Sequence, residues 1–439
     1  MKTVALVTFG CAKNLVDSEV MSGLLSKQGY SFVAAAAKAD VVILNTCGFI
    51  LPAKAEAENA LREAVALKRE FPEKKVIAAG CYVERYKDTL RVRYPEIDAW
   101  IGVGSFDKIV QAIEERSFTE STEAFLLDET TPRVLSTPTG WAYLKVSEGC
   151  SHQCSFCAIP LIKGSYRSRE ISSIVEEAKG MASRGVKEVN LISQDTTYFG
   201  RDSGEKDGLV RLLRELVQVG GLEWIRILYG YPEEITDALL EIMQESKICP
   251  YLDVPFQHAD IRIIDKMRRA MDGQRALKLI HKVRYKIPDI ALRTTLIVGF
   301  PGEGPKEFNA LKKFVREAQF NHLGVFTYSL EEGTSSFDLG DPVRESEKLR
   351  RKDIVMGLQT EISYEKNKKY VGRKLDVLVE GRMNQAPHWF VGRSRFQAPE
   401  VDGVVFIDSG EDISRVANSI RQVEILEPDV YDLSGIFVK

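Results

Sequence analysis

The chain has 439 residues, which predicts two to four domains, and its 44% hydrophobic and 28% charged residues exclude a disordered chain. Its 60 basic and 63 acidic residues leave a net charge of −3, which excludes a global positive field that would attract nucleic acid or an anionic membrane. The sequence has no apolar run long enough to span a membrane and no signal peptide, so we expect a cytoplasmic protein without membrane contact.

Residues 1–118 alternate short, β-rich apolar runs with amphipathic helical patterns. The apolar runs are VALVTFG, DVVILNT and KVIAAG, and helical patterns cover 16–28 and 52–71. This alternation predicts an open parallel α/β domain. Between 119 and 137 the periodicity fades into Thr, Ser, Glu and Pro, which predicts a linker, although its apolar FLL could pair with a sheet edge.

Residues 138–368 repeat a strand followed by a helix about six times. The predicted strands are AYLKVSEG, EVNLISQ, WIRILYG, YLDVPFQ, LRTTLIVGF and HLGVFTYS. Six units are too many for a small open sheet and too few for an eight-fold barrel, so we expect an incomplete (βα)6 barrel with its mouth at the strand C-termini. Residues 369–439 contain short β-rich runs separated by Gly, Asp and Asn turns, which predicts a small all-β barrel of about five strands.

Three of the seven cysteines, Cys150, Cys154 and Cys157, lie close together directly after the first predicted barrel strand. An odd cysteine count without an export signal favours metal ligation or catalysis over a disulfide framework. Three thiolates would leave one iron of a 4Fe–4S cluster open to a small molecule, whereas a closed zinc site needs four ligands. The alternative is a zinc site of three cysteines and His152.

Cys11, Cys47 and Cys81 form a second set that is spread along the sequence. Each cysteine follows the C-terminal end of a predicted parallel strand. Ligands collect outside these ends in open α/β sheets, so we expect the three thiols to meet there and hold a second cluster. The alternative for any one of them is a small buried hydrophobe. Cys249 matches neither set, and we expect it to be structural.

Polar residues and glycine near other predicted strand ends are weaker candidates for cofactor contacts. They are Gln194, Asp195, Thr196, Arg167 and Gly299. The first three could hydrogen-bond a polar cofactor, the arginine could pair a carboxylate, and the glycine brings backbone close to the barrel mouth. The alternatives are a solvated turn, a surface arginine and a common Gly-Pro turn. Motifs for nucleotide hydrolysis, zinc proteolysis and serine hydrolysis do not occur.

The two cysteine sets resemble those of the radical S-adenosylmethionine methylthiotransferases. The CxxxCxxC of 150–157 is similar to the superfamily signature, whose cluster binds S-adenosyl-L-methionine through its open iron. Cys11, Cys47 and Cys81 match the cysteines that hold an auxiliary 4Fe–4S cluster in that family, and the all-β C-terminus resembles a TRAM domain. The resemblance covers nearly the whole chain and implies an enzyme with two 4Fe–4S clusters and S-adenosyl-L-methionine as cofactors.

Two branches of this family differ in substrate, one modifying tRNA adenosine and the other the β-carbon of an aspartate in ribosomal protein uS12. The segments GCAKNLVDSE, NTCGFI, YLDVPFQHA and FQAPEVDGVVFI resemble the second branch. Residues 366–439 carry 11 basic and 11 acidic residues, a balance that suits docking onto a basic protein at least as well as RNA binding.

The resemblance therefore implies uS12 as the protein substrate, with RNA contact secondary, and an electron donor such as flavodoxin. The nearer alternative is a tRNA adenosine methylthiotransferase. The more distant alternative is a non-catalytic zinc protein that binds RNA through its β-barrel.

Overall fold

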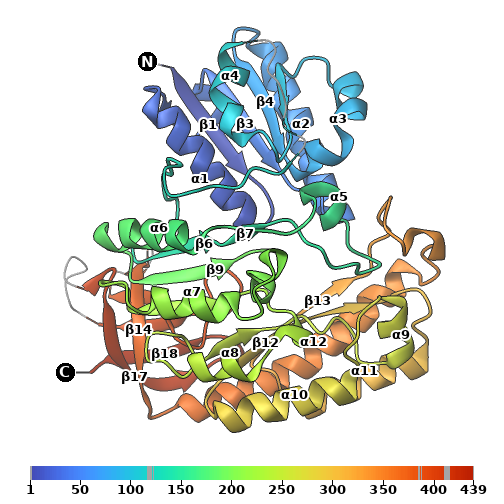
Figure 1. The fold of residues 1–439 in the computed structure, drawn as a ribbon, viewed down its shortest axis with the longest axis vertical. Helices are drawn as coiled ribbons and strands as arrows, with labels where there is room; N and C mark the ends of the chain where they lie inside the picture. Colours follow the sequence, from blue (N-terminus) through green and yellow to red (C-terminus); the bar gives the residue numbers. More distant parts are fainter. Residues whose placement is uncertain are drawn as a thin grey trace.

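The N-terminal part of the computed structural model is an open sheet of five parallel strands in the order β2-β1-β3-β4-β5 (Figure 1). The structure describes residues 2–115, 121, 123–383, 386, 388–409 and 416–438. The strands are β1 (Thr3–Thr8), β2 (Ser31–Phe32), β3 (Val41–Thr46), β4 (Lys75–Gly80) and β5 (Ala99–Ile101). The helices are α1 (Ala12–Lys27), α2 (Leu51–Glu70), α3 (Cys81–Arg93) and α4 (Ile109–Glu114).

Both faces of this sheet are covered by helices. Val4 packs on the side of α1 and α4, whereas the next residue, Ala5, packs on the side of α2 and α3. Successive strand residues point to opposite faces, so a sheet covered on both sides requires continuous apolar runs. All six residues of β3 are buried accordingly, and the predicted open parallel α/β domain is confirmed.

The central part is an incomplete barrel of six parallel strands, as predicted. Two three-stranded sheets, β6-β9-β10 and β11-β12-β13, form its wall. Its strands are β6 (Trp141–Lys145), β9 (Glu188–Ile192), β10 (Trp224–Ile227), β11 (Tyr251–Asp253), β12 (Ala291–Val298) and β13 (His322–Thr327). Its helices are α6 (Ile171–Ser183), α7 (Gly208–Leu216), α8 (Asp237–Ile242), α9 (Ile261–Lys266), α10 (Gly273–Lys286), α11 (Pro305–Ala318) and α12 (Glu345–Asn367).

The two sheets are joined by few backbone contacts, and β11, the first strand of the second sheet, is shorter than the sequence predicts. Residues 251–257 were expected to form one strand, but β11 ends at Asp253, and only an isolated bridge joins Ile225 to Ile248. Pro255 lies just beyond β11 and has no N–H to donate to a neighbouring strand, which explains why the ladder stops.

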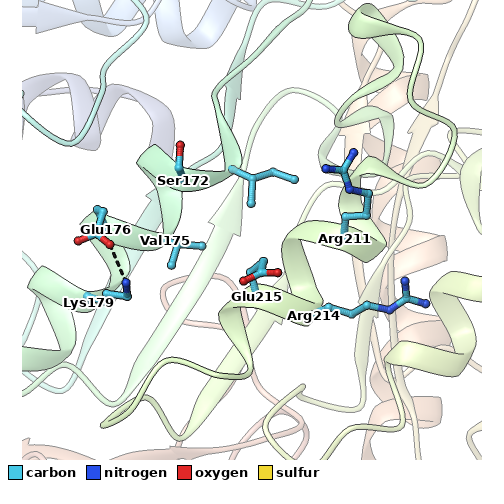
Figure 2. Close-up of a pocket in the computed structure, with 8 residues that line it drawn as sticks. Ser172, Val175, Glu176, Lys179, Arg211, Arg214 and Glu215 are labelled. Carbon is cyan, nitrogen blue, oxygen red and sulfur yellow. Dashed lines mark hydrogen bonds and ion pairs between the residues drawn. The ribbon is translucent and has the colours of Figure 1, made fainter.

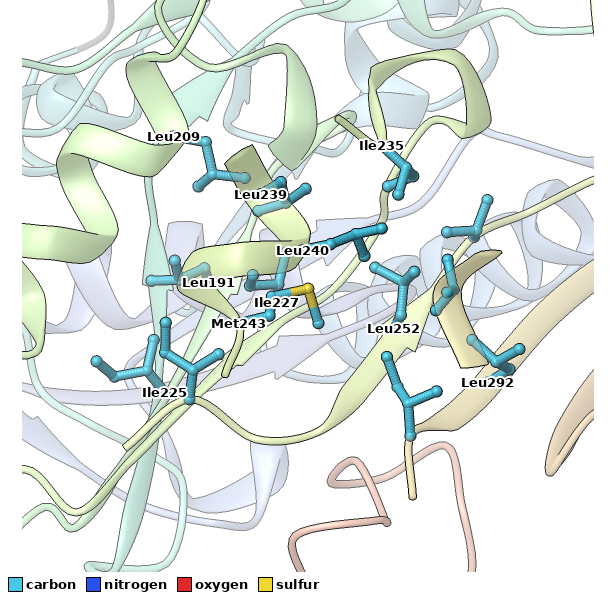
Figure 3. Packing of buried hydrophobic residues seen from close by; sticks show 14 of the residues in the cluster. Leu191, Leu209, Ile225, Ile227, Ile235, Leu239, Leu240, Met243, Leu252 and Leu292 are labelled. Atoms are coloured by element: carbon cyan, nitrogen blue, oxygen red, sulfur yellow. The ribbon is translucent and has the colours of Figure 1, made fainter. Parts of the chain in front are cut away.

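An aliphatic core fills the space between the barrel wall and its outer helices (Figure 3). Leu191, Ile225 and Leu252 face outward from three neighbouring strands and meet Leu239 and Leu240 of α8. Burying each of these side chains contributes about 1.5–3 kcal/mol relative to exposure, so this layer holds helices and strands together.

Both neighbouring domains contribute side chains to a buried cluster with the barrel strands. Val16 of α1 and Ala398 of the C-terminal part share one buried cluster with Trp141, Tyr143 and Tyr251 of the barrel strands. The barrel strands therefore share a packed core with both flanking domains.

The C-terminal part is a closed barrel of five strands in the order β14-β15-β16-β18-β17, which confirms the predicted all-β domain. The strands are β14 (Lys374–Arg382), β15 (Trp389–Ser394), β16 (Val405–Asp408), β17 (Ile420–Pro428) and β18 (Leu433–Phe437). Arg393 of this barrel and Arg226 both pair with Glu188, at 2.7 and 2.8 Å, in a fully buried network.

The described part of the predicted linker runs over the N-terminal domain without forming a strand. Phe125 donates its backbone N–H to the carbonyl of Val103 at 2.8 Å, just beyond β5, and Arg133 pairs with Glu19 of α1 at 2.6 Å. The predicted boundary at 118 lies outside the described residues. In the described ranges, no helix combines the length and hydropathy that crossing a membrane requires.

Candidate functional site

The three N-terminal cysteines lie at one edge of the N-terminal sheet. Cys11 is the N-cap residue of α1, Cys47 follows β3, and Cys81 is the first residue of α3 after β4. β1, β3 and β4 are neighbours, and their ends lie close together: Thr8 pairs with Asn45, and Thr46 pairs with Gly80. Figure 1 shows the carboxyl ends of these strands directed toward the central barrel.

Glycines bring the loops that carry these cysteines into contact. Gly10 has φ +91°, and a Cβ there would lie 2.7 Å from Cys47 Cβ and 2.9 Å from its Sγ. A Cβ on Gly48 would lie 2.6 Å from the Cα of Tyr82, next to Cys81. The backbones around the three cysteines therefore pack against one another.

Burial keeps the Cys47 and Cys81 thiols protonated in the protein alone. It raises the pKa of Cys47 to about 11 and that of Cys81 further, and the nearby Cys11 adds to both shifts. Cys81 Sγ donates to Asn14 Oδ1 at 3.4 Å. A thiol must lose its proton to bind metal, so only a cationic centre would make these thiolates stable.

The second set lies on the loop between β7 (Ser147–Glu148) and α5 (Ile159–Lys163), and β7 pairs with β8 (Arg167–Ser168). Cys150 donates its backbone N–H to the Gly164 carbonyl at 3.0 Å, and Cys157 to the Cys154 carbonyl at 3.1 Å. Burial raises the pKa of Cys150 to about 11 and that of Cys157 to about 12, and Cys154 adds to both shifts. These thiols have the same requirement for a cationic centre.

A lysine at the start of the barrel acts on the N-terminal cysteine set. Lys163, at the end of α5, acts on the buried Cys81 thiol and lowers its pKa against the larger effect of burial. Within the described ranges, no three His, Cys, Asp or Glu side chains converge on the position of a single metal ion. In a 4Fe–4S cluster each thiolate binds a different iron, so its sulfurs need not converge on one point.

An arginine that the sequence did not indicate contacts the second cysteine set. Arg269 Nη1 donates to Cys154 Sγ at 3.7 Å, and its guanidinium lies 3.9 Å from the centroid of the Tyr231 ring. The His152 ring also stacks on Tyr231, with the two ring centroids 3.7 Å apart. His152 Nε2 lies 2.6 Å from Asp195 Oδ2. Asp195 thus engages one ring nitrogen of His152, and stacking on Tyr231 fixes the ring plane. No local motif marks Arg269, which lies 115 residues after Cys154.

The candidate cofactor contacts all have partners within the chain. Gln194 Nε2 donates to Glu148 Oε1 at 2.8 Å, but the Gln194 Oε1 atom is buried without a partner. Asp195 Oδ1 also accepts from the backbone of Thr197 at 2.9 Å, and Thr196 Oγ1 accepts from Ser193 at 3.4 Å. A buried polar atom normally has a hydrogen-bond partner. The unpartnered Gln194 Oε1 is therefore free to accept a hydrogen bond from a bound polar group.

The remaining two candidates contact other segments. Arg167 pairs with Glu123 of the linker at 2.8 Å and donates to the Ala124 carbonyl. Gly299 has φ +76°, and a Cβ there would lie 2.4 Å from Lys348 Cγ of α12. A contact of either residue with a cofactor stays a prediction.

A surface hollow of about 530 Å³ lies on the outer side of the barrel, between α6 and α7 (Figure 2). Ser172, Lys179, Arg211 and Glu215 line it, and its charges are mixed. Neither cysteine set reaches this hollow, so it is not part of the candidate site.

Comparisons with known proteins match the three parts of the chain in order. Uncharacterized protein family UPF0004 matches residues 3–102, the radical SAM superfamily 144–315 and the TRAM domain 371–438. The ribosomal protein uS12 methylthiotransferase RimO of Aquifex aeolicus is 44% identical over 98% of this chain and 96% of its own length. The RimO of Desulfitobacterium hafniense is 43% identical over 100% of this chain and 99% of its own length.

Solved structures share the fold at low identity. TsrM from Kitasatospora setae, a radical S-adenosylmethionine methyltransferase, aligns with a TM-score of 0.57 and 15% identity over 89% of this chain and 80% of its own. OxsB, a cobalamin-dependent S-adenosylmethionine radical enzyme, aligns with a TM-score of 0.52 and 12% identity over 81% and 56%. The family follows from the relatives that match almost end to end: the chain belongs to the ribosomal protein uS12 methylthiotransferases of the radical S-adenosylmethionine superfamily.

Proposed function

We propose that this protein adds a methylthio group to the β-carbon of an aspartate in ribosomal protein uS12. The observation that carries the proposal is the presence of two separate trios of thiols, one at the sheet edge and one at the start of the barrel, in a chain that is 44% identical to RimO. A tRNA adenosine methylthiotransferase is not favoured, since the relatives matched along nearly the whole chain are uS12 enzymes.

We assign Cys150, Cys154 and Cys157 to the 4Fe–4S cluster that binds S-adenosyl-L-methionine, and the sheet-edge trio Cys11, Cys47 and Cys81 to a second 4Fe–4S cluster. Three soft thiolates apiece suit iron–sulfur clusters with one open iron. When bound, the clusters and S-adenosyl-L-methionine supply one-electron chemistry that breaks an unactivated C–H bond, and the sulfur and methyl that are transferred.

The chain's own residues position these groups and exclude water. Arg269 supplies a cationic donor to the Cys154 sulfur, and such contacts around a cluster tune its electronic properties. Gln194 is our first candidate for a contact with S-adenosyl-L-methionine, because its buried oxygen is open. The other four candidates already have partners, so a contact with S-adenosyl-L-methionine would require them to rearrange or to use atoms that are not engaged. They are Asp195, Thr196, Arg167 and Gly299.

We further propose four segments: 1–118, the linker 119–137, the radical SAM core 138–368 and the TRAM-like barrel 369–439. The three matched families fall inside the first, third and fourth segments, which supports this division. A ribosomal protein substrate supports a cytoplasmic location, and flavodoxin is a suitable class of one-electron donor.

The test compares alanine variants of the two cysteine sets in anaerobically purified protein. Cys→Ala at 150, 154 or 157 should abolish S-adenosylmethionine cleavage, whereas Cys→Ala at 11, 47 or 81 should spare cleavage and lose methylthio transfer to a uS12 peptide. Wild-type protein should contain about eight irons, as expected for two 4Fe–4S clusters. Cys249→Ala is the matched control, since Cys249 is buried in an apolar cluster outside both sets. Equal loss of cleavage from both sets would refute the assignment, and modification of tRNA instead of the peptide would refute the substrate.

A further inference from the structure

A lysine without an anionic partner reaches from the N-terminal domain to the barrel mouth. Lys13 lies in the first turn of α1, two residues after Cys11, and is partly exposed. Its Nζ lies 3.4 Å from the centroid of the Tyr229 ring, which follows β10 at the carboxyl end of the barrel strands. No carboxylate in the described part of the chain forms an ion pair with Lys13.

The two carboxylates that influence Lys13 electrostatically form ion pairs with other cations. Asp253 and Glu148 act on the Lys13 ammonium electrostatically, but neither pairs with it. Asp253 pairs with Arg293 at 3.0 Å, and Glu148 with Lys145 at 2.7 Å. Within the described residues, both carboxylates are thus held in ion pairs with other cations, and Lys13 forms none with either of them.

The aromatic partner of Lys13 is held in an unusual backbone conformation. Tyr229 has φ 60°, in the left-handed region that bulky residues rarely adopt. Its carbonyl accepts from the Thr196 N–H at 2.9 Å, and its own N–H donates to Asp253 Oδ2 at 3.2 Å. Such strain persists where surrounding contacts fix it and is concentrated at ligand sites. A ring face orients an ammonium group without neutralising it, so Lys13 stays able to bind an anion.

We propose that Lys13 binds the side-chain carboxylate of the aspartate that is modified, and that it thereby selects an acidic acceptor residue. This inference rests on the proposed function. The β-carbon of aspartate is bonded directly to its carboxylate carbon, so an ammonium that holds the carboxylate also places the reacting carbon. Because Lys13 is two residues from Cys11, the same contact would place that carbon near the sheet-edge cysteines.

The test measures how the holoenzyme discriminates a uS12 peptide carrying the acceptor aspartate from the same peptide carrying asparagine. The wild type should bind the aspartate peptide about 10–100-fold more tightly, the range expected for a charged hydrogen bond. Lys13→Met should bind both peptides equally, and Lys13→Arg should keep most of the preference. Lys54→Met is the matched control, because Lys54 also lies 5.7 Å from a tyrosine ring but pairs with Glu331 at 2.8 Å. It should keep the wild-type preference, since Arg85 still neutralises Glu331.

Iron content, the visible spectrum and S-adenosylmethionine cleavage without peptide are measured on the same variants and should match the wild type. An unchanged preference in Lys13→Met would overturn the inference, as would an equal loss of affinity for both peptides. Loss of iron with the preference retained would assign Lys13 to the cluster and not to the substrate. If the wild type neither binds nor modifies either peptide, the proposed function itself fails. This result comes from the wild type alone, so it is distinguishable from a failure of the Lys13 inference.

Discussion

Replacing Asp17 with asparagine tests how the N-terminal domain is fixed to the barrel. Asp17 of α1 lies 2.6 Å from Lys145 and 3.1 Å from Lys163, and all three side chains are at most 2% exposed. Glu148 completes this group at 2.7 Å from Lys145 and 3.4 Å from Lys163. The group contains two cations and two anions, so it is neutral as a whole.

Asp17→Asn keeps the shape of the side chain and removes one negative charge. Lys145 keeps its close contact with Glu148, whereas Lys163 keeps only the longer one, so Lys163 becomes the poorly compensated cation. Removing one partner of a buried ion pair costs about 3–5 kcal/mol. Asparagine still accepts hydrogen bonds, so we expect about 3 kcal/mol.

Hydrogen exchange of the α1 amides is the direct assay, because detachment of α1 exposes them to solvent. A loss of about 3 kcal/mol should speed exchange roughly 100-fold where opening of this interface limits it. Glu176→Gln is the control: its pair with Lys179 has the same 2.6 Å separation, but both side chains are more than half exposed. We expect at most about 0.5 kcal/mol from it.

A double variant decides whether charge imbalance is the cause. Lys163→Met combined with Asp17→Asn leaves one cation and one anion, and should recover about half of the loss caused by Asp17→Asn alone. A change in α1 exchange of less than about threefold in Asp17→Asn would show that the buried ion pairs do not fix α1. Simple addition of the losses from the two single changes would show that charge imbalance is not the cause.

Three further predictions follow from the same structure. Gly10→Ala should displace Cys47 and lower the iron content by about half, measured by metal analysis, whereas Gly29→Ala, with a similar φ of +80° but nothing within 4 Å, should not. Arg269→Met should lower the reduction potential of the cluster whose sulfur it contacts, as measured by redox titration with EPR detection, and Arg269→Lys should lower it less. Burial alone raises the pKa of Glu148, but Lys145 and Lys163 hold that pKa well below the ordinary value near 4.3. The charged Glu148 should therefore stabilise the fold above about pH 4.3, and this stabilisation should be lost as the pH falls below that value. Urea unfolding between pH 6 and pH 3 should show this loss, and Glu148→Gln should reduce the slope.

The sequence could predict that three cysteines share one edge of the N-terminal sheet, because this placement depends on local rules. Apolar runs such as VVILNT define parallel strands, and the ends of parallel strands share one edge, so Cys11, Cys47 and Cys81 could be placed together without coordinates. The order of the three folds follows from the same changes of periodicity. These features need only the spacing of apolar residues and turns.

Contacts between distant charged residues could not be predicted in this way. Lys145 lies inside a strand pattern, and nothing in its neighbourhood shows that it is fully buried against Asp17, 128 residues earlier. The same is true of Gln194, which the sequence indicated as a cofactor contact and which donates to Glu148. A polar side chain at a strand end can serve a ligand or an interdomain contact, and only tertiary structure shows its partners.

Helix α1 connects these observations, because it carries both a proposed cluster ligand and the contacts that fix the domain. Cys11 is its N-cap residue, Lys13 reaches Tyr229, and Asp17 and Glu19 form buried ion pairs with Lys145 and Arg133. At 1.5 Å per residue, Asp17 lies only about 9 Å along the helix from Cys11. A rigid helix transmits position over that length, so the buried pairs set where Cys11 stands relative to the barrel. Loosening them with Asp17→Asn should therefore impair methylthio transfer more than S-adenosylmethionine cleavage, because cleavage requires only the barrel's own cysteines.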